Sequence, residues 1–437
     1  MRWKSDTFKG WGQHLSAQMT LSRPSRLHGL LDAFKEQPGP ALGGLRSYGD
    51  AALKSGGHGH LMTRMDRFLS FDTETGILTA EAGITMRDIL DVTLPKGWGP
   101  SALPGTGFAT LGGCIAMDVH GKDHRTAGNF SAQVLSLDLL KPDGKTQTLS
   151  RDKNKRLFFA TLGGLGQTGI ISQATLQLHE ATQNVRVKKQ SFENLEEGMA
   201  LLEANDARFA VAWIDALATG LQLGRGVLET SDYTEGDPKA RSQSVKSVPF
   251  TAPKFAMSKW PVKLFNRFRY RRYLSRPSEN ARFVDVQYPL DQVLGWNRLY
   301  GKDGFHQFQA CFPLTKSDAA MRALCEKISA SQAASPLVVM KRLGPSGESL
   351  LGFPQEGFTL AVDFQHRKEA AKLLSELHDI TRAHEGRVYL AKDSAAKPQD
   401  VEIGYSAGIA EWQDLVLKAD PKKSMITDLV QRLELRS

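Results

Sequence analysis

A glycine-rich window between Leu103 and Gly128, LPGTGFATLGGCIAMDVHGKDHRTAG, constrains the fold of this chain more than any other stretch. Its turns at Pro104-Gly105-Thr106 and Thr110-Leu111-Gly112-Gly113 are expected to leave backbone N–H groups free for a phosphate. The small and apolar residues from Gly112 to Val119 are expected to begin a helix, whose N-terminus favours an anion. The window therefore predicts a cradle for a large anionic cofactor, while a plain glycine-rich crossover loop fits it equally well.

The composition is typical of a globular protein without disulfides. The chain has 437 residues, 41% hydrophobic and 24% charged, which is enough for two domains of ordinary size. The cysteines Cys114, Cys311 and Cys325 lie far apart and form no CxxC pair. This spacing predicts neither a disulfide framework nor a metal site, and it favours a reduced compartment.

Targeting and charge patterns narrow the location and the partners. The N-terminus has no apolar segment of signal-peptide length, and no run of about 18 apolar residues occurs. We therefore expect a cytoplasmic protein without a signal peptide or transmembrane segment, for which peripheral contact with the inner membrane stays open. The formal net charge of +9 indicates an anionic partner, which leaves nucleic acid, membrane lipid and a phosphorylated substrate open.

The sequence GLGQTG at 164–169 spells the GxGxxG fingerprint of dinucleotide-binding folds, but its context excludes that interpretation. The fingerprint has to open a helix after a strand. Here residues 170–178 follow, in which small or apolar residues alternate with mostly polar ones, and this period of two predicts a strand. Similar patterns predict strands over Ile77–Glu81 and Val134–Leu140, and helices over Arg26–Glu36 and from Thr85 to near Pro95.

The segment 234–280 is the least regular part of the second half and combines cations with aromatic rings. From Lys254 to Arg276 there are eight basic residues, six aromatic residues and no acidic one. This combination favours a flexible lid or a membrane-contact segment, because rings sit at headgroup depth while Lys and Arg bind lipid phosphates. A solvated basic loop and a single-stranded RNA site share part of the pattern.

Later stretches are expected to place polar groups on strands. Phe305–Gln309 would present two glutamines on one face, where their amides could bind sugar hydroxyls or simply face water. Phe358–Phe364 carries an aspartate, Gly386–Ser394 is expected to be a strand with a cation just after it, and a helix over Ile426–Leu435 is expected to close the chain.

Several motifs, in this order, resemble one family. GLRSYGD, LPGT followed by TLGG, DVHGK, FFATLGGLGQTGII and VYLAKDS are similar to the vanillyl-alcohol-oxidase (PCMH-type) FAD-binding flavoproteins. Within that superfamily the similarity is closest to the decaprenylphosphoryl-β-D-ribose 2′-oxidases. It runs from Gly10-Trp11-Gly12 almost to the C-terminus and is weakest over residues 184–285.

The resemblance implies an α+β fold with an inserted domain. Residues 1–183 would form an FAD-binding domain of two subdomains. Residues 184–385 would form a substrate domain with an antiparallel sheet, including the segment 234–280. Residues 386–437 would return to the FAD-binding domain.

The resemblance also implies the FAD contacts. The first glycine-rich turn lacks the histidine through which many relatives attach FAD, so non-covalent FAD is expected, and no metal. The expected cofactor-binding residues are Gly44, Leu45, Arg46, Ser47, Tyr48, Gly49, Asp50, Gly105, Thr106, Thr110, Leu111, Gly112, Gly113, Met117, His120, Gly169, Ile171, Tyr389 and Lys392.

The implied reaction is hydride transfer from a ribosyl C2′–H to flavin N5. Lys392 would offset negative charge on the flavin. His120 would accept the hydroxyl proton. Lys122, the third catalytic residue, and Lys341 would hold the diphosphate-like charge of the substrate or its hydroxyls. The remaining expected substrate contacts are Tyr300, Gln307, Gln309, Thr359, Ala361 and Asp363, of which Thr359 and Ala361 replace the Asn and Cys of the best-known members.

The leading hypothesis is oxidation of a polyprenylphosphoryl-β-D-ribose at its 2′-hydroxyl, the oxidative half of an epimerisation to arabinose. A separate NAD(P)H-dependent reductase would complete it, with a lipid-linked sugar phosphate as substrate and no nucleic acid as partner. An alditol or aldonolactone oxidase of the same superfamily is the closest alternative. A flavin-free basic protein that binds membranes or RNA is the alternative from another class.

Overall fold

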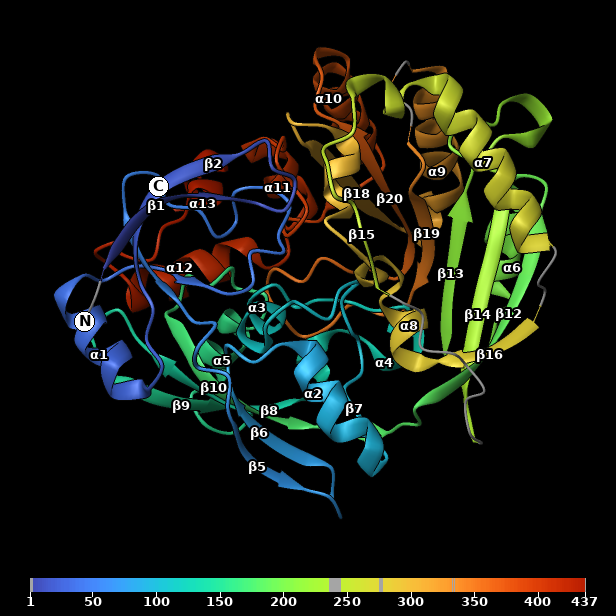
Figure 1. Cartoon of the computed structure of the whole chain (residues 1–437). Helices are drawn as coiled ribbons and strands as arrows, with labels where there is room; N and C mark the ends of the chain where they lie inside the picture. Colours follow the sequence, from blue (N-terminus) through green and yellow to red (C-terminus); the bar gives the residue numbers. More distant parts are fainter. Residues whose placement is uncertain (1–2, 236–244, 275–277, 332, 334, 437) are drawn as a thin grey trace.

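The computed structural model describes residues 3–235, 245–274, 278–331, 333 and 335–436. Helices and mainly antiparallel sheets form two halves, and the glycine-rich loops lie between them (Figure 1). The predicted segment 234–280 includes residues 236–244 and 275–277, which lie outside the described residues.

The N-terminal half contains a four-stranded and a five-stranded sheet within the described residues. The first has the order β1 (Lys4–Lys9), β2 (Ser16–Ser22), β4 (His58–Leu61), β3 (Ala41–Leu42). The second has the order β5 (Phe68–Asp72), β6 (Ile77–Glu81), β10 (Ile170–Gln177), β8 (Val134–Leu140), β9 (Thr146–Ser150). Helices here are α1 (Leu27–Glu36), α2 (Met86–Thr93), α3 (Leu111–Ala116), α4 (His124–Ala127) and α5 (Lys155–Thr161).

Several local predictions for this half are confirmed. β6 and β8 have the predicted bounds, and GLGQTG is followed by the strand β10 rather than by a helix. α2 begins where predicted because Thr85 accepts a hydrogen bond from the N–H of Asp88, and the Asp88 side chain bonds back to Thr85.

The other half is built on an eight-stranded sheet of described residues. Its order is β16 (Ser278–Arg282), β12 (Asn184–Phe192), β14 (Gly226–Thr234), β13 (Phe209–Ile214), β19 (Val338–Leu343), β20 (Gly357–Gln365), β18 (Phe305–Pro313), β21 (Arg387–Val388). Two-stranded sheets pair β7 (Trp98–Gly99) with β11 (His179–Glu180) and β15 (Lys246–Ser247) with β17 (Val293–Leu294). The helices with this half are α6 (Leu195–Glu203), α7 (Lys259–Leu274), α8 (Phe283–Gln287), α9 (Leu314–Ala330), α10 (Lys368–Ala383) and α11 (Pro398–Gly404). The last two helices, α12 (Ile409–Ala419) and α13 (Asp428–Arg432), lie against the N-terminal half (Figure 1).

The alternation of side chains along the central strands gives this sheet two different faces. Buried Phe308, Met340 and Leu360 belong to a core that also takes apolar residues from α6, α9 and α10. Their neighbours on the same strands point to the opposite face. The register aligns five of those neighbours in one row across β14, β13, β19, β20 and β18: Val227, Trp213, Val339, Ala361 and Gln309.

Three loops that are far apart in the sequence meet between the two halves. A Cβ added to Gly43 would lie 2.2 Å from Oγ1 of Thr110, so the first glycine-rich turn touches the second. A Cβ added to Gly49 would lie 1.9 Å from the carbonyl oxygen of Asp393. The N–H of Tyr48 also donates to the carbonyl of Ala391, at 3.1 Å. The C-terminal return is therefore packed directly on the first turn.

Three expectations need correction or restatement. The strand expected over Gly386–Ser394 is wrong beyond Val388, because the chain turns there with the N–H of Lys392 donating to the carbonyl of Tyr389. The closing helix is shorter than expected, Asp428–Arg432. The described part of segment 234–280 contains the helix α7, and no described helix combines the length and apolar character needed to cross a bilayer.

The contact between Gly49 and Asp393 predicts a strong effect of a single methyl group. We expect Gly49→Ala to lower the free energy of unfolding by about 3 kcal/mol, because the added carbon collides with backbone rather than with a movable side chain. Gly105→Ala is the control, since a Cβ there meets no atom within 4 Å. Equal unfolding midpoints of the two variants in urea would contradict the packing described here.

Candidate functional site

A cavity of about 1030 Å³ lies where the three loops meet the open face of the large sheet. The predicted site residues that line it are Gly44, Leu45, Arg46, Ser47, Tyr48, Gly105, Thr106, Thr110, Gly112, Gly113, Met117, His120, Lys122, Gly169, Ile171, Gln307, Gln309, Lys341, Ala361, Tyr389 and Lys392. The structure thus brings together residues from both glycine-rich turns, the large sheet and the C-terminal return.

Six predicted contacts lie behind the cavity wall instead. Leu111, the first residue of α3, is fully buried in the core, and Asp50 is turned toward Arg432. Tyr300 donates to Asp363 at 3.2 Å, and Thr359 accepts from Gln309 at 3.4 Å. The residues whose expected direct contact is corrected in this way are Gly49, Asp50, Leu111, Tyr300, Thr359 and Asp363.

The first glycine-rich turn has the properties of an anion cradle. The backbone N–H groups of residues 44–47 donate to no other described residue. Leu45 has a φ of 51°, an uncommon conformation that turns consecutive N–H groups toward one side. The Arg46 guanidinium lies 4.3 Å from the ring centroid of Trp11, and its buried Nε has no partner among the described residues. This turn fits a diphosphate.

In the second glycine-rich turn, Thr110-Leu111-Gly112-Gly113, two of the backbone N–H groups are already used within the protein. The N–H groups of Leu111 and Gly112 donate to the carbonyls of Ile84 and Ala82, at 2.9 and 2.8 Å. The prediction that they are free for a phosphate is therefore wrong, because the connection between β6 and α2 packs against this turn and its carbonyls accept from them. A Cβ at Gly112 would lie 3.0 Å from Cβ of Ala82, so the glycine allows a close approach of the two segments.

Lys392 stands at the junction of the turn and the sheet. Its Nζ lies 3.9 Å from the ring centroid of Tyr48, in a cation–π contact. Burial lowers the pKa of Lys392, and the charge of Asp363 opposes this effect. Burial in turn raises the pKa of Asp363. A desolvated cation at this position interacts strongly with negative charge that forms in the cavity.

Two further lysines, Lys341 and Lys122, line the cavity. Burial and the nearby charges of Lys392 and Lys122 lower the pKa of Lys341 to about 7, and its Nζ donates to the carbonyl of Gly121 at 3.4 Å. Lys122 is more firmly held, since Nζ donates to the carbonyl of Val286 at 2.7 Å and lies 3.6 Å from Oε1 of Glu229. Lys341 is therefore the cation that is freer to bind an added anion.

The surroundings of His120 oppose its predicted role as proton acceptor. Burial and the neighbouring cations, Lys341 first, lower the pKa of His120 well below its ordinary value. Nε2 of His120 lies 3.1 Å from Nε2 of Gln309, so the amide donates to the imidazole. A neutral ring that already accepts a hydrogen bond is a weak base, and it is well placed to orient Gln309.

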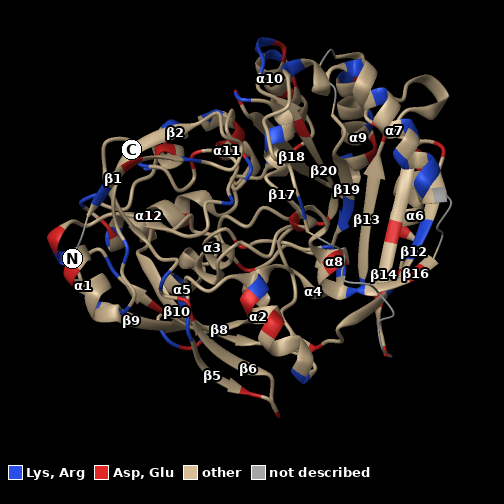
Figure 2. Ribbon diagram, in the orientation of Figure 1, with Lys and Arg blue, Asp and Glu red and all other residues tan. Residues whose placement is uncertain are grey.

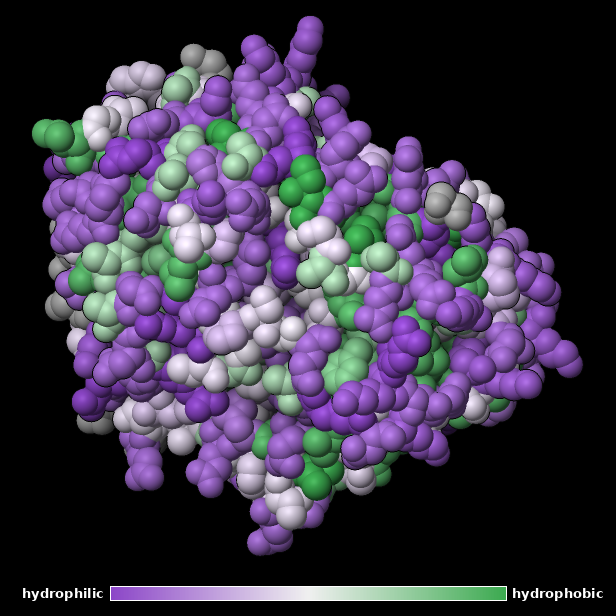
Figure 3. Space-filling model, turned by 180° about the vertical axis from the view of Figure 1, so that it is seen from behind, coloured by the Kyte–Doolittle hydropathy of each residue, from purple (hydrophilic) through white to green (hydrophobic). Residues whose placement is uncertain are grey.

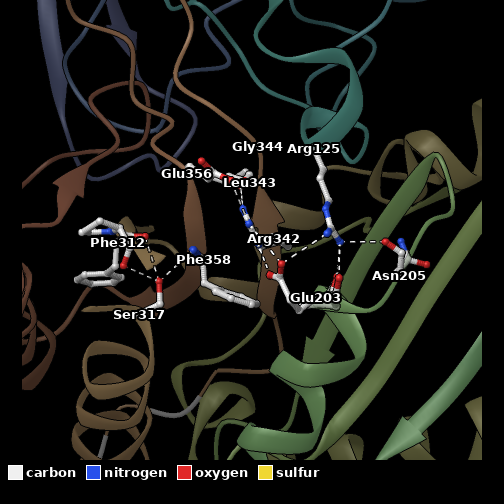
Figure 4. A network of polar contacts seen from close by, with 12 residues as sticks. Arg125, Glu203, Asn205, Phe312, Ser317, Arg342, Leu343, Gly344, Glu356 and Phe358 are labelled. Carbon is white, nitrogen blue, oxygen red and sulfur yellow. Dashed lines mark hydrogen bonds and ion pairs between the residues drawn. The ribbon is translucent and has the colours of Figure 1, made fainter. Parts of the chain in front are cut away.

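The outer side of β19 explains why Lys341 faces the cavity. Arg342 points the other way, where its guanidinium binds Glu203 of α6 at 2.5 Å and Glu356 at 3.3 Å (Figure 4). Arg125 of α4, within the glycine-rich window, donates to the carbonyl of Asn205 at 2.9 Å in the same network. These contacts fix the register of β19 against α6, and alternation then directs Lys341 inward.

Arg432 is a structural residue of the site that sequence analysis missed. From α13 it donates two hydrogen bonds to the carboxylate of Asp50, each at 2.8 Å, and one to Asp393 at 2.9 Å. Asp50 follows the first turn and Asp393 follows Lys392, so one guanidinium ties these loops together. No local pattern marks this contact, because Asp50 and Arg432 are 382 positions apart.

Comparison with known proteins decides the family. A family model described as an FAD binding domain matches residues 33–150. Decaprenylphosphoryl-beta-D-ribose oxidase of Mycolicibacterium smegmatis is 30% identical over 98% of this chain and 97% of its own length. The chain belongs to this family of FAD-dependent oxidoreductases. Its fold is the α+β PCMH-type fold, and its cofactor is FAD.

Other relatives share less of the chain. A protein of Streptomyces coelicolor described as uncharacterized is 28% identical over 80% of this chain and its whole own length. L-galactono-1,4-lactone dehydrogenase 1 of Oryza sativa subsp. japonica is 30% identical over 37% of this chain and 28% of its own length. For the family cofactor, the free amides of residues 44–47 and the unpartnered Nε of Arg46 fit the diphosphate.

The contacts of Arg432 predict that it holds the flavin site together. Arg432→Met removes the ion-pair partner of two nearly buried carboxylates, although Asp393 keeps hydrogen bonds from the N–H groups of Ala395 and Ala396. We therefore expect a loss of about 3 kcal/mol in the free energy of unfolding and a lower FAD content after purification. Arg156→Met, which removes an exposed ion pair with Glu411, should cost at most about 1 kcal/mol. An Arg432→Met protein with wild-type stability and FAD content would contradict this role.

Proposed function

We propose that this protein uses FAD to oxidise the 2′-hydroxyl of a polyprenylphosphoryl-β-D-ribose to the 2′-keto sugar, the oxidative half of an epimerisation to arabinose. The observation that carries the proposal is the row of side chains across the cavity floor. It begins with the amide of Gln309 and ends with apolar Val339, Trp213 and Val227. A floor that is polar at one end and apolar at the other suits a sugar phosphate with a hydrocarbon tail.

The polar end would bind the sugar and its phosphate. Gln307 and Gln309 lie on one face of β18 and line the cavity, with amide groups that can bind ribose hydroxyls. Gln307 is held by Asp363, to which its amide donates at 2.5 Å, and Tyr300 donates to the same carboxylate. Lys341 would bind the phosphate as a cation, with Lys122 beside it.

Lys392 and His120 would act next to the reacting carbon. FAD, when bound, supplies the acceptor for the hydride that leaves the sugar. Lys392 would place its positive charge where negative charge develops, which stabilises the transition state more than the ground state. His120 would orient Gln309 and through it the 2′-hydroxyl. Tyr389, which lines the same wall, would pack against the ring system.

A further proposal concerns how FAD is attached to the protein. The first turn reads Arg46-Ser47-Tyr48 without a histidine, and in the described lining of the cavity histidine occurs only at position 120. We infer from this that FAD is held without a covalent bond.

The keto product requires a separate NAD(P)H-dependent reductase to give arabinose, and a polyprenyl substrate requires peripheral contact with a membrane.

An alditol or aldonolactone oxidase is the alternative, favoured by the partial match to the lactone dehydrogenase. A small polyol has no hydrocarbon tail, so no part of it would fill the apolar end of the cavity at Val339, Trp213 and Val227. That end therefore argues for the lipid-linked substrate.

The substrate proposal predicts a selective loss of flavin colour. We expect acid precipitation to release the yellow flavin into the supernatant. Without oxygen, a polyprenylphosphoryl ribose should bleach the bound flavin, while xylitol and gulonolactone should not. Lys392→Ala should slow the bleaching about 100-fold with FAD still bound, because it removes a buried cation from the site. Lys418→Ala, at an exposed ion pair with Asp414, is the control. Bleaching by xylitol, or an unchanged rate for Lys392→Ala, would overturn the assignment.

The pKa of Lys341 predicts the pH dependence of substrate capture. Its protonated form binds the phosphate, and this form is lost as the pH rises through about 7. We therefore expect kcat/KM to be level below that pH and to fall above it, since kcat/KM reports the free enzyme. Lys341→Arg keeps its charge and should move the fall to higher pH. A kcat/KM that rises through about 7 would instead identify Lys341 as a base.

A further inference from the structure

The outer face of α7 carries an apolar stripe. Trp260, Leu264 and Phe268 follow one another at intervals of four residues and therefore share one face of the helix. Their exposed fractions are 84%, 64% and 62%, and Phe265 beside them is 48% exposed. Large apolar side chains grouped in this way on a surface mark an interaction site rather than ordinary solvent exposure.

The opposite face of the same helix is what holds it to the protein. Val262 and Asn266 are buried, and Asn266 donates to Asp215 at 2.8 Å. Arg269 donates to the carbonyl of Pro336 at 3.3 Å and stacks on Trp213. The orientation of α7 is therefore fixed by its inner contacts, and the stripe is directed outward by helical geometry.

Positive charge surrounds the stripe. Lys263, Arg267 and Arg271 are exposed on α7, and the stretch from Lys254 to Arg276 has no acidic residue. Figure 2 shows Lys and Arg recurring along this helix. The reverse face of the molecule is different, because hydrophilic residues dominate it and hydrophobic ones are scattered among them (Figure 3). Rings flanked by cations are complementary to a bilayer with anionic headgroups.

The helix also stands between this surface and the apolar end of the cavity. Its inner residues Arg269 and Tyr273 line the cavity together with Trp213. At the outer edge of the large sheet, α7 lies beside β12 and β14 (Figure 1). A surface that covered the outer stripe would thus lie one helix diameter, about 10 Å, from the apolar floor.

We propose that α7 docks this protein on the surface of a bilayer that contains anionic lipids, with Trp260, Leu264, Phe265 and Phe268 at the depth of the headgroups. This inference rests on the proposed function in one respect, because a polyprenyl substrate is the reason for the enzyme to meet a bilayer. The docking surface itself is assigned from the exposed apolar side chains and the cations of α7. Docking here brings the apolar end of the cavity next to the hydrocarbon from which a polyprenyl tail would enter.

The test is co-sedimentation of the FAD-loaded, full-length protein with phosphatidylcholine vesicles that contain or lack phosphatidylglycerol. We expect the wild type to bind only the anionic vesicles and to be released by salt. Two variants test the surface: the triple variant Trp260→Ser, Leu264→Ser, Phe268→Ser and the charge variant Lys263→Glu, Arg267→Glu. The affinity of each for the anionic vesicles should fall by at least about tenfold. The double variant Ile403→Ser, Leu417→Ser changes exposed apolar residues on α11 and α12 and should bind like the wild type.

Two measurements separate docking from folding and from catalysis. Thermal unfolding and FAD content should be unchanged in all variants, because every replaced side chain is on the surface. Vesicle binding is measured without substrate, so a failure of the proposed oxidation leaves it intact. With a short-chain, water-soluble polyprenylphosphoryl ribose and no vesicles, the α7 variants should reduce the flavin at the wild-type rate.

Three results would overturn the docking proposal: no binding of the wild type to anionic vesicles, equal binding by the α7 variants, or equal loss of binding in the Ile403 and Leu417 control. Tight binding of single-stranded RNA that anionic vesicles fail to displace would also overturn it, in favour of the RNA alternative.

Discussion

The ion pairs of Arg432 with Asp50 and Asp393 are the constraint on which the rest of this structure depends. Both carboxylates are nearly buried, so each is stabilised by a charged partner, and the Arg432 guanidinium reaches both. The pairing holds the end of the first glycine-rich turn against the residue that follows Lys392. The first glycine-rich turn and the buried cation of Lys392 are therefore held next to each other by one side chain.

The second constraint is the strict alternation of side chains in the large sheet. On β19, Arg342 is engaged by acidic groups on the helix side, and Lys341 is left on the cavity side. On β18 the same alternation sends Phe308 into the core and leaves Gln307 and Gln309 to the cavity. One face of the sheet thus packs in the core and stabilises the fold. On the other face the side chains of a single row change from the amide of Gln309 to the hydrocarbon of Val227.

The sequence predicted features that depend on near neighbours. Strands β6 and β8, the cap at Thr85 and the rejection of GLGQTG as a dinucleotide fingerprint all follow from short-range periodicity and turn chemistry, and all are confirmed. The meeting of two glycine-rich turns with Lys392 was inferred through a family resemblance. The assignment of each residue to a role, and the division into domains, stay predictions.

The features that the sequence did not predict depend on contacts between segments that are far apart in the chain. The N–H groups of Leu111 and Gly112 are used because another segment packs on them, which no turn signature reveals. Trp213 and Val339 form one floor only through the strand register, and Arg432 reaches Asp50 only in the folded chain. The low pKa of His120 comes from burial and from two lysines far away in the sequence, so its basicity was overestimated from its residue type.

The central claim is that both glycine-rich turns and Lys392 hold one FAD molecule. A crystal structure of the protein purified with its flavin tests this most directly. We expect the diphosphate within hydrogen-bond distance of the N–H groups of residues 44–47, with the isoalloxazine ring next to Tyr389 and Lys392. A flavin bound elsewhere, or a Lys392 loop separated from the first turn, would contradict it.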